Sequence, residues 1–250
     1  MNDVGDIMGE RKVVVISGGT SGIGLASAKI LAEEGWYPVI LGTSEENGRL
    51  AEKEVGSARF ISCDVTKTEE VDKAVKEAAA CGDIHGIVAS AGKYKEGLLD
   101  DMADEEIQQL FDVNVFGVMR LVRAALPFLR KTHGSIVAVS SDAALQGNVQ
   151  CSLYGATKGA VTAFIRSLAL ELAIDGIRAN VVCPGDVDTP MLDRQLKDYG
   201  GTKEEMKNWY PLMRIARAEE VGNIIAFLLS DKASYMTGAI IPVDGGLTDW

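Results

Sequence analysis

The sequence has few histidines, cysteines and prolines, and these shortages exclude several kinds of protein. Among 250 residues there are only two histidines, His85 and His133, and four widely spaced cysteines without a CxxC pair. No spacing typical of a zinc site occurs, so we predict no bound metal. Scattered cysteines in a long chain are typical of free thiols in a reducing compartment, which predicts a cytoplasmic protein. With 6 prolines and 47% hydrophobic residues, the chain is neither collagen-like nor disordered.

Positive charge and long apolar runs are also scarce. Lys and Arg number 25 against 36 Asp and Glu, which gives a formal net charge of −11. An acidic surface repels phosphate backbones, so we expect no nucleic-acid partner and no anionic membrane partner. No run of 18 apolar residues occurs, and residues 1–10 lack the basic and apolar regions of a signal peptide. We therefore interpret residues 1–10 as an N-terminal tail and expect a small-molecule substrate.

The chain does contain seven short β-branched runs that alternate with segments of helical periodicity. Such near-continuous apolar strands are typical of a parallel sheet covered on both faces. No linker or change in composition divides the pattern, which predicts one doubly wound α/β domain of the Rossmann type over residues 1–250. The predicted strands are 12–17, 37–41, 59–63, 84–90, 135–140, 177–182 and 239–243. The predicted helices are 23–35, 46–55, 67–80, 104–130, 153–173 and 219–229.

A glycine-rich turn, SGGTSGIG at residues 17–24, lies between the first strand and the first helix. Glycines at 18, 22 and 24 allow the backbone to turn and let a pyrophosphate approach the helix N-terminus. There, free N–H groups and the positive end of the helix dipole favour an anion. A glycine-rich turn alone can also be a tight connection that binds nothing, but its position between strand and helix favours a dinucleotide site.

Tyr154 and Lys158 lie four residues apart on a predicted helix and therefore share one face. A nearby ammonium favours the phenolate, so Tyr154 is a candidate acid or base near neutral pH. Ser141 follows the predicted strand 135–140, and active sites of parallel sheets gather at the carboxyl ends of strands. Taken singly, a Tyr–Lys pair is more often a solvated helix face, and Ser141 a helix cap.

The order and spacing of these motifs resemble the short-chain dehydrogenase/reductase superfamily, in its single-domain branch of about this length. The resemblance runs from about residue 11 to 246, nearly the whole chain. The turn resembles the family's TGxxxGxG, residues 89–92 (ASAG) stand where NNAG is usual, and residues 183–190 (CPGDVDTP) resemble its PGxxxTP turn beside the nicotinamide. VDGG at 243–246 resembles its C-terminal turn. The positions that match its catalytic tetrad are Asn114, Ser141, Tyr154 and Lys158.

The resemblance implies an enzyme that interconverts a secondary alcohol and a ketone with a nicotinamide cofactor. Ser141 would bind the substrate oxygen, and Tyr154 would exchange its proton. Lys158 would lower the pKa of Tyr154 and bind the ribose, and Asn114 would hold a water that relays protons. The turn, the strand ends and the resemblance together indicate these cofactor-binding residues besides Tyr154 and Lys158: Gly18, Thr20, Ser21, Gly22, Ile23, Gly24, Thr43, Ser44, Asp64, Val65, Ala91, Gly92, Pro184, Gly185, Val187 and Thr189.

The end of the second strand bears on the choice of cofactor. NAD-preferring sites usually place a carboxylate there for the ribose 2′-hydroxyl, but this chain has Gly42 and Thr43. Thr43 and Ser44 can donate hydroxyls to a 2′-phosphate, whereas Glu45 and Glu46 would repel it. On balance we predict that NADP(H) is favoured over NAD(H).

Residues 190–213 are predicted to form a lid over the substrate, because apolar and charged residues alternate there as on an amphipathic flap. An apolar lid favours a hydrophobic carbonyl such as a steroid, bile acid or fatty compound, although the same residues could equally make subunit contacts. Asp142 could instead bind a polar group. The candidate substrate residues are Asp142, Met191 and Trp209.

Other functions remain open. The alternatives are a 3-oxoacyl carrier protein reductase and a sugar or polyol dehydrogenase. The charge of −11, with Asp175 where the carrier-dependent members have a basic residue, counts against the first. A non-catalytic dinucleotide sensor is a distant alternative, and a serine hydrolase is excluded because GTSGI at 19–23 does not match GxSxG. The resemblance also implies a homotetramer, formed through helices 104–130 and 153–173 at small residues such as Gly159, Ala160 and Ala163, and through residues 239–250.

Overall fold

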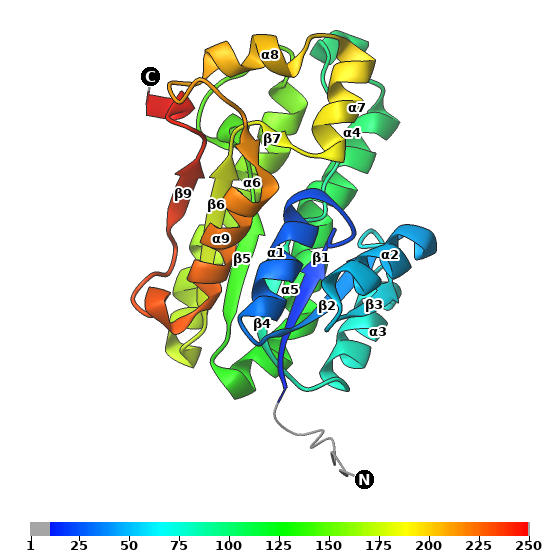
Figure 1. Ribbon diagram of the computed structural model, residues 1–250, viewed down its shortest axis with the longest axis vertical. Helices are drawn as coiled ribbons and strands as arrows, with labels where there is room; N and C mark the ends of the chain where they lie inside the picture. Colours follow the sequence, from blue (N-terminus) through cyan, green and yellow to red (C-terminus); the bar gives the residue numbers. More distant parts are fainter. Residues whose placement is uncertain (1–10, 250) are drawn as a thin grey trace.

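A seven-stranded parallel sheet forms the centre of the protein, with strand order β3-β2-β1-β4-β5-β6-β9 (Figure 1). The computed structural model describes residues 11–249, so the predicted tail at 1–10 lies outside it. The strands are β1 (Lys12–Ser17), β2 (Tyr37–Gly42), β3 (Arg59–Ser62), β4 (Asp83–Ala89), β5 (Ser135–Val139), β6 (Arg178–Pro184) and β9 (Ile240–Val243). All seven predicted strands are confirmed, within two residues at every end.

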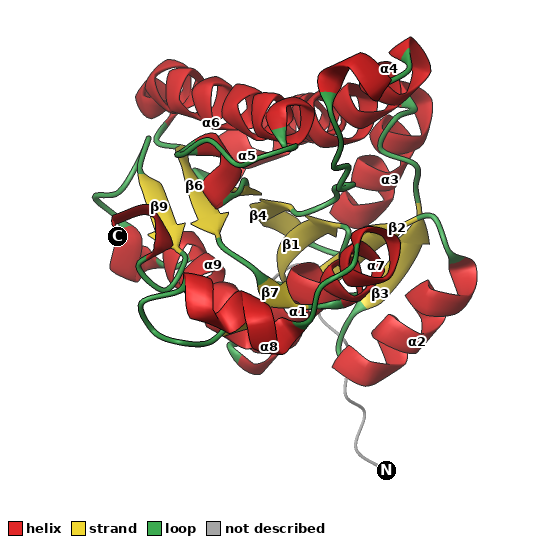
Figure 2. Cartoon of the chain, turned by 90° about the horizontal axis from the view of Figure 1, so that it is seen from above, coloured by secondary structure: helices red, strands yellow, loops and turns green. Residues whose placement is uncertain are grey.

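Helices cover both faces of the sheet (Figure 2). One layer holds α1 (Gly22–Glu33), α2 (Glu45–Val55) and α9 (Ala218–Leu229), and the opposite layer holds α3 (Thr68–Ala79), α5 (Gly117–Thr132) and α6 (Ser152–Leu172). Each layer has its own apolar core, because alternate side chains of every strand point to opposite faces. The predicted doubly wound α/β fold is therefore confirmed.

The predicted helix 104–130 is helical but interrupted. It consists of α4 (Asp104–Phe111), a π-helical turn (Asp112–Phe116) and α5. The first residue of α5, Gly117, packs so tightly that a Cβ there would lie 2.8 Å from Cγ2 of Val65. A π turn inserts one extra residue into the helix, which the apolar periodicity does not reveal. Such turns occur often at functional sites, and this one contains Asn114.

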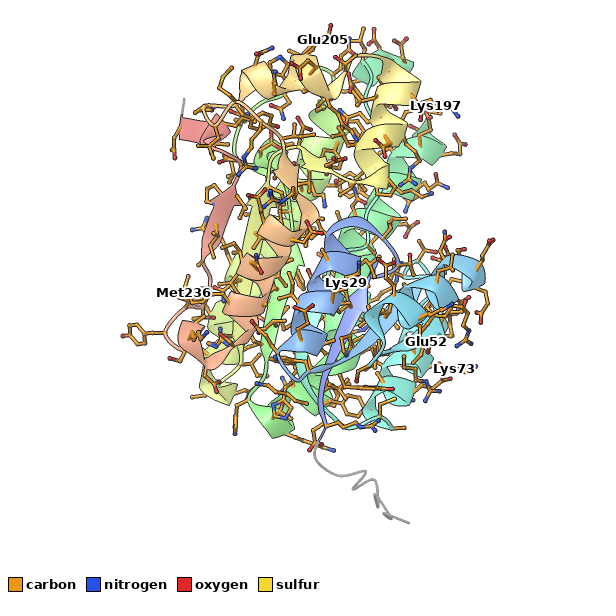
Figure 3. All side chains as sticks on the ribbon, viewed as in Figure 1. Lys29, Glu52, Lys73, Lys197, Glu205 and Met236 are labelled. Atoms are coloured by element: carbon orange, nitrogen blue, oxygen red, sulfur yellow. The ribbon has the colours of Figure 1, made fainter. Side chains whose placement is uncertain are left out.

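The segment that follows β6 lies above the carboxyl end of the sheet. It comprises α7 (Pro190–Tyr199) and the short α8 (Lys203–Met206), and a two-stranded parallel sheet of β7 (Val187–Asp188) and β8 (Ala216–Arg217) closes its base. The sequence did not predict β7 and β8. Figure 3 shows Lys197 and Glu205 on the outer side of this segment, whereas Leu192 and Met206 are buried. The segment is therefore amphipathic, as predicted.

The C-terminal residues contact this segment. Leu212 N donates a hydrogen bond to Gly245 O at 3.3 Å, and a Cβ on Gly246 would lie 3.0 Å from Pro211. Leu247 lines the same cavity as the lid residues. Within residues 11–249 no helix has the length and apolar character needed to cross a bilayer. The described part of the chain also contains no group of three or more His, Cys, Asp or Glu side chains suited to a metal ion.

Candidate active site

The turn between β1 and α1 is built from close backbone contacts. Gly18 has a φ of +67°, and a Cβ there would lie 2.7 Å from Cα of Ala91. A Cβ on Gly24 would lie 2.3 Å from the carbonyl oxygen of Gly18. Ser21 precedes α1 but makes no side-chain cap, so the first N–H groups of the helix receive no hydrogen bond from it. The turn thus offers the small side chains and N–H groups that a pyrophosphate requires.

Ser17 holds this turn against the end of β4. Its backbone oxygen accepts from Ser90 N at 3.2 Å, and its hydroxyl oxygen accepts from Ala91 N at 3.3 Å. Residues 89–92 lack the two asparagines usual for the resembled family. The contacts of Ser17 join the carboxyl ends of β1 and β4 at that place.

Ser141, Tyr154 and Lys158 line one cavity of about 770 Å³ at the carboxyl end of the sheet. Ser141 follows β5, and Tyr154 and Lys158 occupy the first turns of α6, where their spacing directs both to one face. The Ser141 hydroxyl donates to Asp142 Oδ1 at 2.7 Å, and its oxygen accepts from Ala143 N at 3.2 Å. All three predicted side chains are buried.

Burial sets the protonation of this group. It raises the pKa of Tyr154 well above its usual value, and a hydrogen bond with Ser141 opposes part of that rise. Burial also lowers the pKa of Lys158 to about 8, although its ammonium donates to Val139 O at 2.9 Å. At neutral pH, Tyr154 therefore holds its proton and Lys158 keeps most of its charge.

Asn114 connects the loop after β4 to α6. Its Nδ2 donates to Lys93 O at 2.9 Å and to Thr157 Oγ1 at 3.1 Å, and its Oδ1 accepts from Lys93 N at 2.8 Å. A Cβ on Gly92 would lie 3.5 Å from Asn114 Oδ1 and 3.6 Å from Lys158 Nζ. Asn114 is thus close to the catalytic group, and its part in a proton relay stays a prediction.

The other predicted residues fall into two groups. The cavity is lined by the predicted substrate residues and by most predicted cofactor residues: Asp142, Met191, Trp209, Gly18, Thr20, Ser21, Gly22, Ile23, Gly92, Pro184, Gly185, Val187 and Thr189. Six predicted cofactor residues are not among the residues that line it: Gly24, Thr43, Ser44, Asp64, Val65 and Ala91. Thr43 is exposed at the end of β2, while Ser44 caps α2 by accepting from Asn47 N at 3.2 Å. Asp64 and Val65 follow β3, and Asp64 Oδ1 accepts two hydrogen bonds from Thr66.

Several residues that line the cavity were not predicted as site residues, and three of them contact other residues of the site. Asp186 lies inside the PGDVDTP turn, Tyr210 was assigned only to the lid, and Tyr94 follows Gly92 by two positions. The Tyr94 ring packs edge-on against Tyr154, with ring centroids 4.9 Å apart. Gln195 Nε2 donates to the Tyr94 hydroxyl at 3.3 Å, so Tyr94 connects Tyr154 to α7. Only Asp186, a carboxylate in a turn already assigned to the cofactor, gave a signal that the sequence could have revealed.

Comparison with known proteins identifies the family. A family model described as Enoyl-(Acyl carrier protein) reductase matches residues 18–248. The chain is 38% identical to 3-alpha-(or 20-beta)-hydroxysteroid dehydrogenase of Mycobacterium tuberculosis, over 94% of this chain and 88% of that protein. It is 36% identical to carbonyl reductase family member 4 of Xenopus laevis, over 94% and 98%. It is 35% identical to L-fucose dehydrogenase of Mus musculus, over 94% and 88%.

Solved structures agree with this result. A short chain dehydrogenase/reductase family protein superposes with a TM-score of 0.88 at 37% identity, covering 96% of this chain and 99% of that one. A variant of actinorhodin polyketide ketoreductase with NADPH gives 0.91 at 30% identity, covering 96% and 98%. The chain therefore belongs to the short-chain dehydrogenase/reductase family, whose members bind NAD(P), and it is an oxidoreductase that acts on alcohol and carbonyl groups.

Proposed function

We propose that this enzyme uses NADP(H) to interconvert a secondary alcohol and a ketone on a substrate with a hydrophobic body. The observation that carries this proposal is the convergence of Ser141, Tyr154 and Lys158 on one cavity beside the glycine-rich turn. Met191 and Trp209 border that cavity from the segment 190–213, which we propose as its lid. When bound, the nicotinamide ring supplies or accepts the hydride.

The side chains of the chain supply orientation and a proton. The Ser141 hydroxyl turns from Asp142 to the substrate oxygen and fixes its position. Tyr154, protonated at neutral pH because burial raises its pKa, gives that oxygen a proton during reduction and removes it during oxidation. The Lys158 ammonium favours the tyrosinate form and hydrogen-bonds the ribose hydroxyls. Asn114 completes the group by holding the relay water.

The preference for NADP(H) rests on the end of β2. Gly42 and Thr43 provide no carboxylate for a ribose 2′-hydroxyl, and exposed Thr43 lies just before the positive end of the α2 dipole. Of the two nearby acidic residues, Glu45 pairs with Arg49 at 2.9 Å, which offsets its repulsion of a phosphate. The related ketoreductase solved with NADPH adds support.

We propose a homotetramer located in the cytoplasm. Gly159 on α6 has open space where a Cβ would stand, and Leu170 and Ile174 near the end of that helix are 77% and 91% exposed. Small residues beside exposed apolar ones suit a helix-to-helix contact between copies. All four cysteines are free thiols, as expected of a reducing compartment. Light scattering should give four times the chain mass of 26.7 kDa, and a monomer would refute the assembly.

The experiment that tests the activity is a substrate panel. Purified protein is mixed with NADPH or NADH and with steroid, fatty, sugar-derived and aromatic ketones, and nucleotide absorbance is followed. We expect turnover of ketones with an apolar body and faster turnover with NADPH. Binding of either nucleotide without turnover of any ketone would favour the sensor alternative. A protein-linked acyl substrate is disfavoured, because the net charge of −11 repels an acidic carrier.

A further inference from the structure

Three carboxylates line the cavity, those of Glu96, Asp142 and Asp186. Glu96 uses one oxygen to accept from the Tyr94 hydroxyl at 2.8 Å. Without substrate, both oxygens of Asp142 accept hydrogen bonds, Oδ1 from the Ser141 hydroxyl at 2.7 Å and Oδ2 from Asn148 Nδ2 at 2.9 Å. The bond to Asn148 remains when the Ser141 hydroxyl turns to a substrate oxygen. Asp186 Oδ2 accepts from the Tyr210 hydroxyl at 2.6 Å. No hydrogen bond from any residue between 11 and 249 reaches Asp186 Oδ1. The cavity therefore contains an acceptor that the protein leaves open.

Asp186 is held in a fixed position. Tyr210, which is buried, donates to the carboxylate and also accepts from Asp186 N at 2.7 Å, so two bonds lock the same pair. Asp186 O accepts from Ala216 N at 3.0 Å, next to the β7–β8 pair that closes the lid. The Tyr210 ring packs on Gly185, where a Cβ would lie 2.8 Å from the ring. A carboxylate so constrained is preorganised for a partner.

The charge of Asp186 reaches the reacting centre. Burial, with a contribution from Asp142, raises the pKa of Asp186 to about 6, so the carboxylate is mostly ionised at neutral pH. Asp142, Asp186 and Tyr154 line the same cavity, and both carboxylates raise the pKa of Tyr154. Asp186 is half-buried, so its free oxygen faces the open cavity, where a substrate donor can hydrogen-bond the carboxylate.

We propose that Asp186 is a specificity-determining residue, and that its free oxygen selects substrates with a hydrogen-bond donor, a hydroxyl or an ammonium group, on the carbon next to the reacting one. This inference rests on the proposed function, because it assumes that a carbonyl binds at Ser141 and Tyr154. The expected substrate combines an apolar body under the lid with a donor that faces Asp186. A carboxylate in the same place would be repelled by Asp186 and Asp142.

A matched set of aromatic ketones tests the proposal. The five compounds share a phenyl ketone and differ only at the carbon beside the carbonyl. They are acetophenone, its α-fluoro, α-hydroxy and α-amino derivatives, and phenylglyoxylate. The fluoro compound withdraws electrons as the hydroxyl does but donates no hydrogen bond. For the wild type we expect kcat/KM of the hydroxy or amino ketone to exceed that of the fluoro ketone about tenfold or more, and phenylglyoxylate to be poorest.

Variants assign the effect to Asp186. The ratio of kcat/KM for the hydroxy or amino ketone to that for the fluoro ketone should fall about tenfold in two variants. Asp186→Asn removes the negative charge, and Tyr210→Phe removes the hydrogen bond that fixes the carboxylate. Asp188→Asn is the matched control, since Asp188 is an exposed carboxylate two residues away, paired with Lys203 at 2.6 Å; its ratio should equal that of the wild type. Cofactor affinity measured by fluorescence verifies that each variant is folded.

The outcomes separate the inference from the function it rests on. Turnover of all five ketones with a wild-type ratio near one, or an unchanged ratio in Asp186→Asn, overturns the role of Asp186. Preference for phenylglyoxylate also overturns it and assigns recognition to Arg194, which lines the cavity from α7. Turnover of the amino but not the hydroxy ketone supports the role and restricts the donor to a cation. Turnover of none of the five contradicts the proposed function itself.

Discussion

The glycine-rich turn at residues 17–24, which we propose to bind the nucleotide, and the proposed substrate end of the cavity differ in which atoms they present. The turn presents backbone groups, and its glycines are required because a Cβ on Gly18 or Gly24 would strike neighbouring backbone. The substrate end presents side chains, such as the hydrogen-bonded pair of Asp186 and Tyr210, which lie 24 residues apart in the chain. A backbone site suits the part that all nicotinamide cofactors share. Side chains can change without altering the fold, which fits relatives named for a steroid, a carbonyl and a sugar.

The largest effect is expected from Tyr154→Phe, which removes a side-chain function and leaves the backbone site intact. The ring packing survives and only the transferable proton is lost, so kcat should fall about 100-fold or more while the nucleotide dissociation constant stays the same. Steady-state kinetics and nucleotide fluorescence measure the two quantities. A variant with more than one tenth of the wild-type kcat would disprove the role of Tyr154.

Gly24→Ala should disturb the glycine-rich turn, at the end of the cavity where we propose that the nucleotide binds. The new methyl would lie 2.3 Å from the carbonyl oxygen of Gly18, so the turn must shift. A strain of about 1–3 kcal/mol is reasonable for such an overpacked contact, and most of it should appear as weaker nucleotide binding. In Gly159→Ala the added methyl meets nothing within 4 Å, and the nucleotide dissociation constant should not change. Equal affinities in the two variants would mean that the turn does not touch the nucleotide.

Thr43→Asp would add side-chain recognition to the nucleotide end. A carboxylate there should repel the 2′-phosphate of NADPH and accept hydrogen bonds from the ribose hydroxyls of NADH. A charge-assisted hydrogen bond contributes roughly 1.5–3 kcal/mol, so the ratio of kcat/KM for NADPH to that for NADH should fall about tenfold or more. A wild type that already prefers NADH more than tenfold would refute our cofactor assignment. An unchanged ratio would mean that residue 43 does not face the ribose.

The last prediction concerns stability rather than turnover, at Lys158, which we propose to serve both the substrate and the nucleotide. Its pKa is lowered from 10.5 to about 8, so the fold disfavours its charge by about 3 kcal/mol below pH 8. This cost disappears as the pH rises from about 8 to 10.5, because the ammonium then loses its proton in the folded state. In the nucleotide-free protein, Lys158→Met should therefore be at least as stable as the wild type at pH 7. The difference in the free energy of unfolding between the two proteins should become smaller toward pH 10.

Denaturant titrations of the wild type and Lys158→Met at several pH values measure that difference. Nucleotide affinity should show the complementary trend: in the wild type it weakens by up to about tenfold from pH 7 to 9, as the ammonium titrates. In Lys158→Met the affinity should be low and nearly independent of pH. A variant clearly less stable than the wild type at pH 7 would show that Lys158 contributes to packing more than its charge costs.

Most of the fold could be predicted from the sequence because its signals are local. Each buried strand is a β-branched run that nothing else in the chain resembles, and strand ends were correct to within two residues. The π-helical turn at Asp112–Phe116 was missed because one inserted residue leaves the apolar periodicity of the helix almost unchanged. The β7–β8 pair was missed because two-residue strands have no periodicity.

At the site, the motifs placed Ser141, Tyr154 and Lys158 correctly beside one another, since helical spacing and a strand end decide their positions. Tyr94 and Tyr210 could not be recognised in the same way. Their relevance comes from contacts with Tyr154 and Asp186, which only the folded chain brings about. The occupied oxygens of Asp142, in contrast to the open one of Asp186, also depend on tertiary contacts.

The contact of the C-terminal residues with the lid has a consequence for a truncated chain. In the chain, β1, the glycine-rich turn and α1 precede all the other elements of the sheet and its helices. The substrate end of the cavity depends on β9, which pairs with β6, and on Leu247, which lines the cavity. Both lie near the end of the described residues. A chain that lacks these C-terminal residues would therefore contain the glycine-rich turn but would not form a complete substrate cavity. Without β9, strand β6 would become an unpaired edge of the sheet, which favours aggregation.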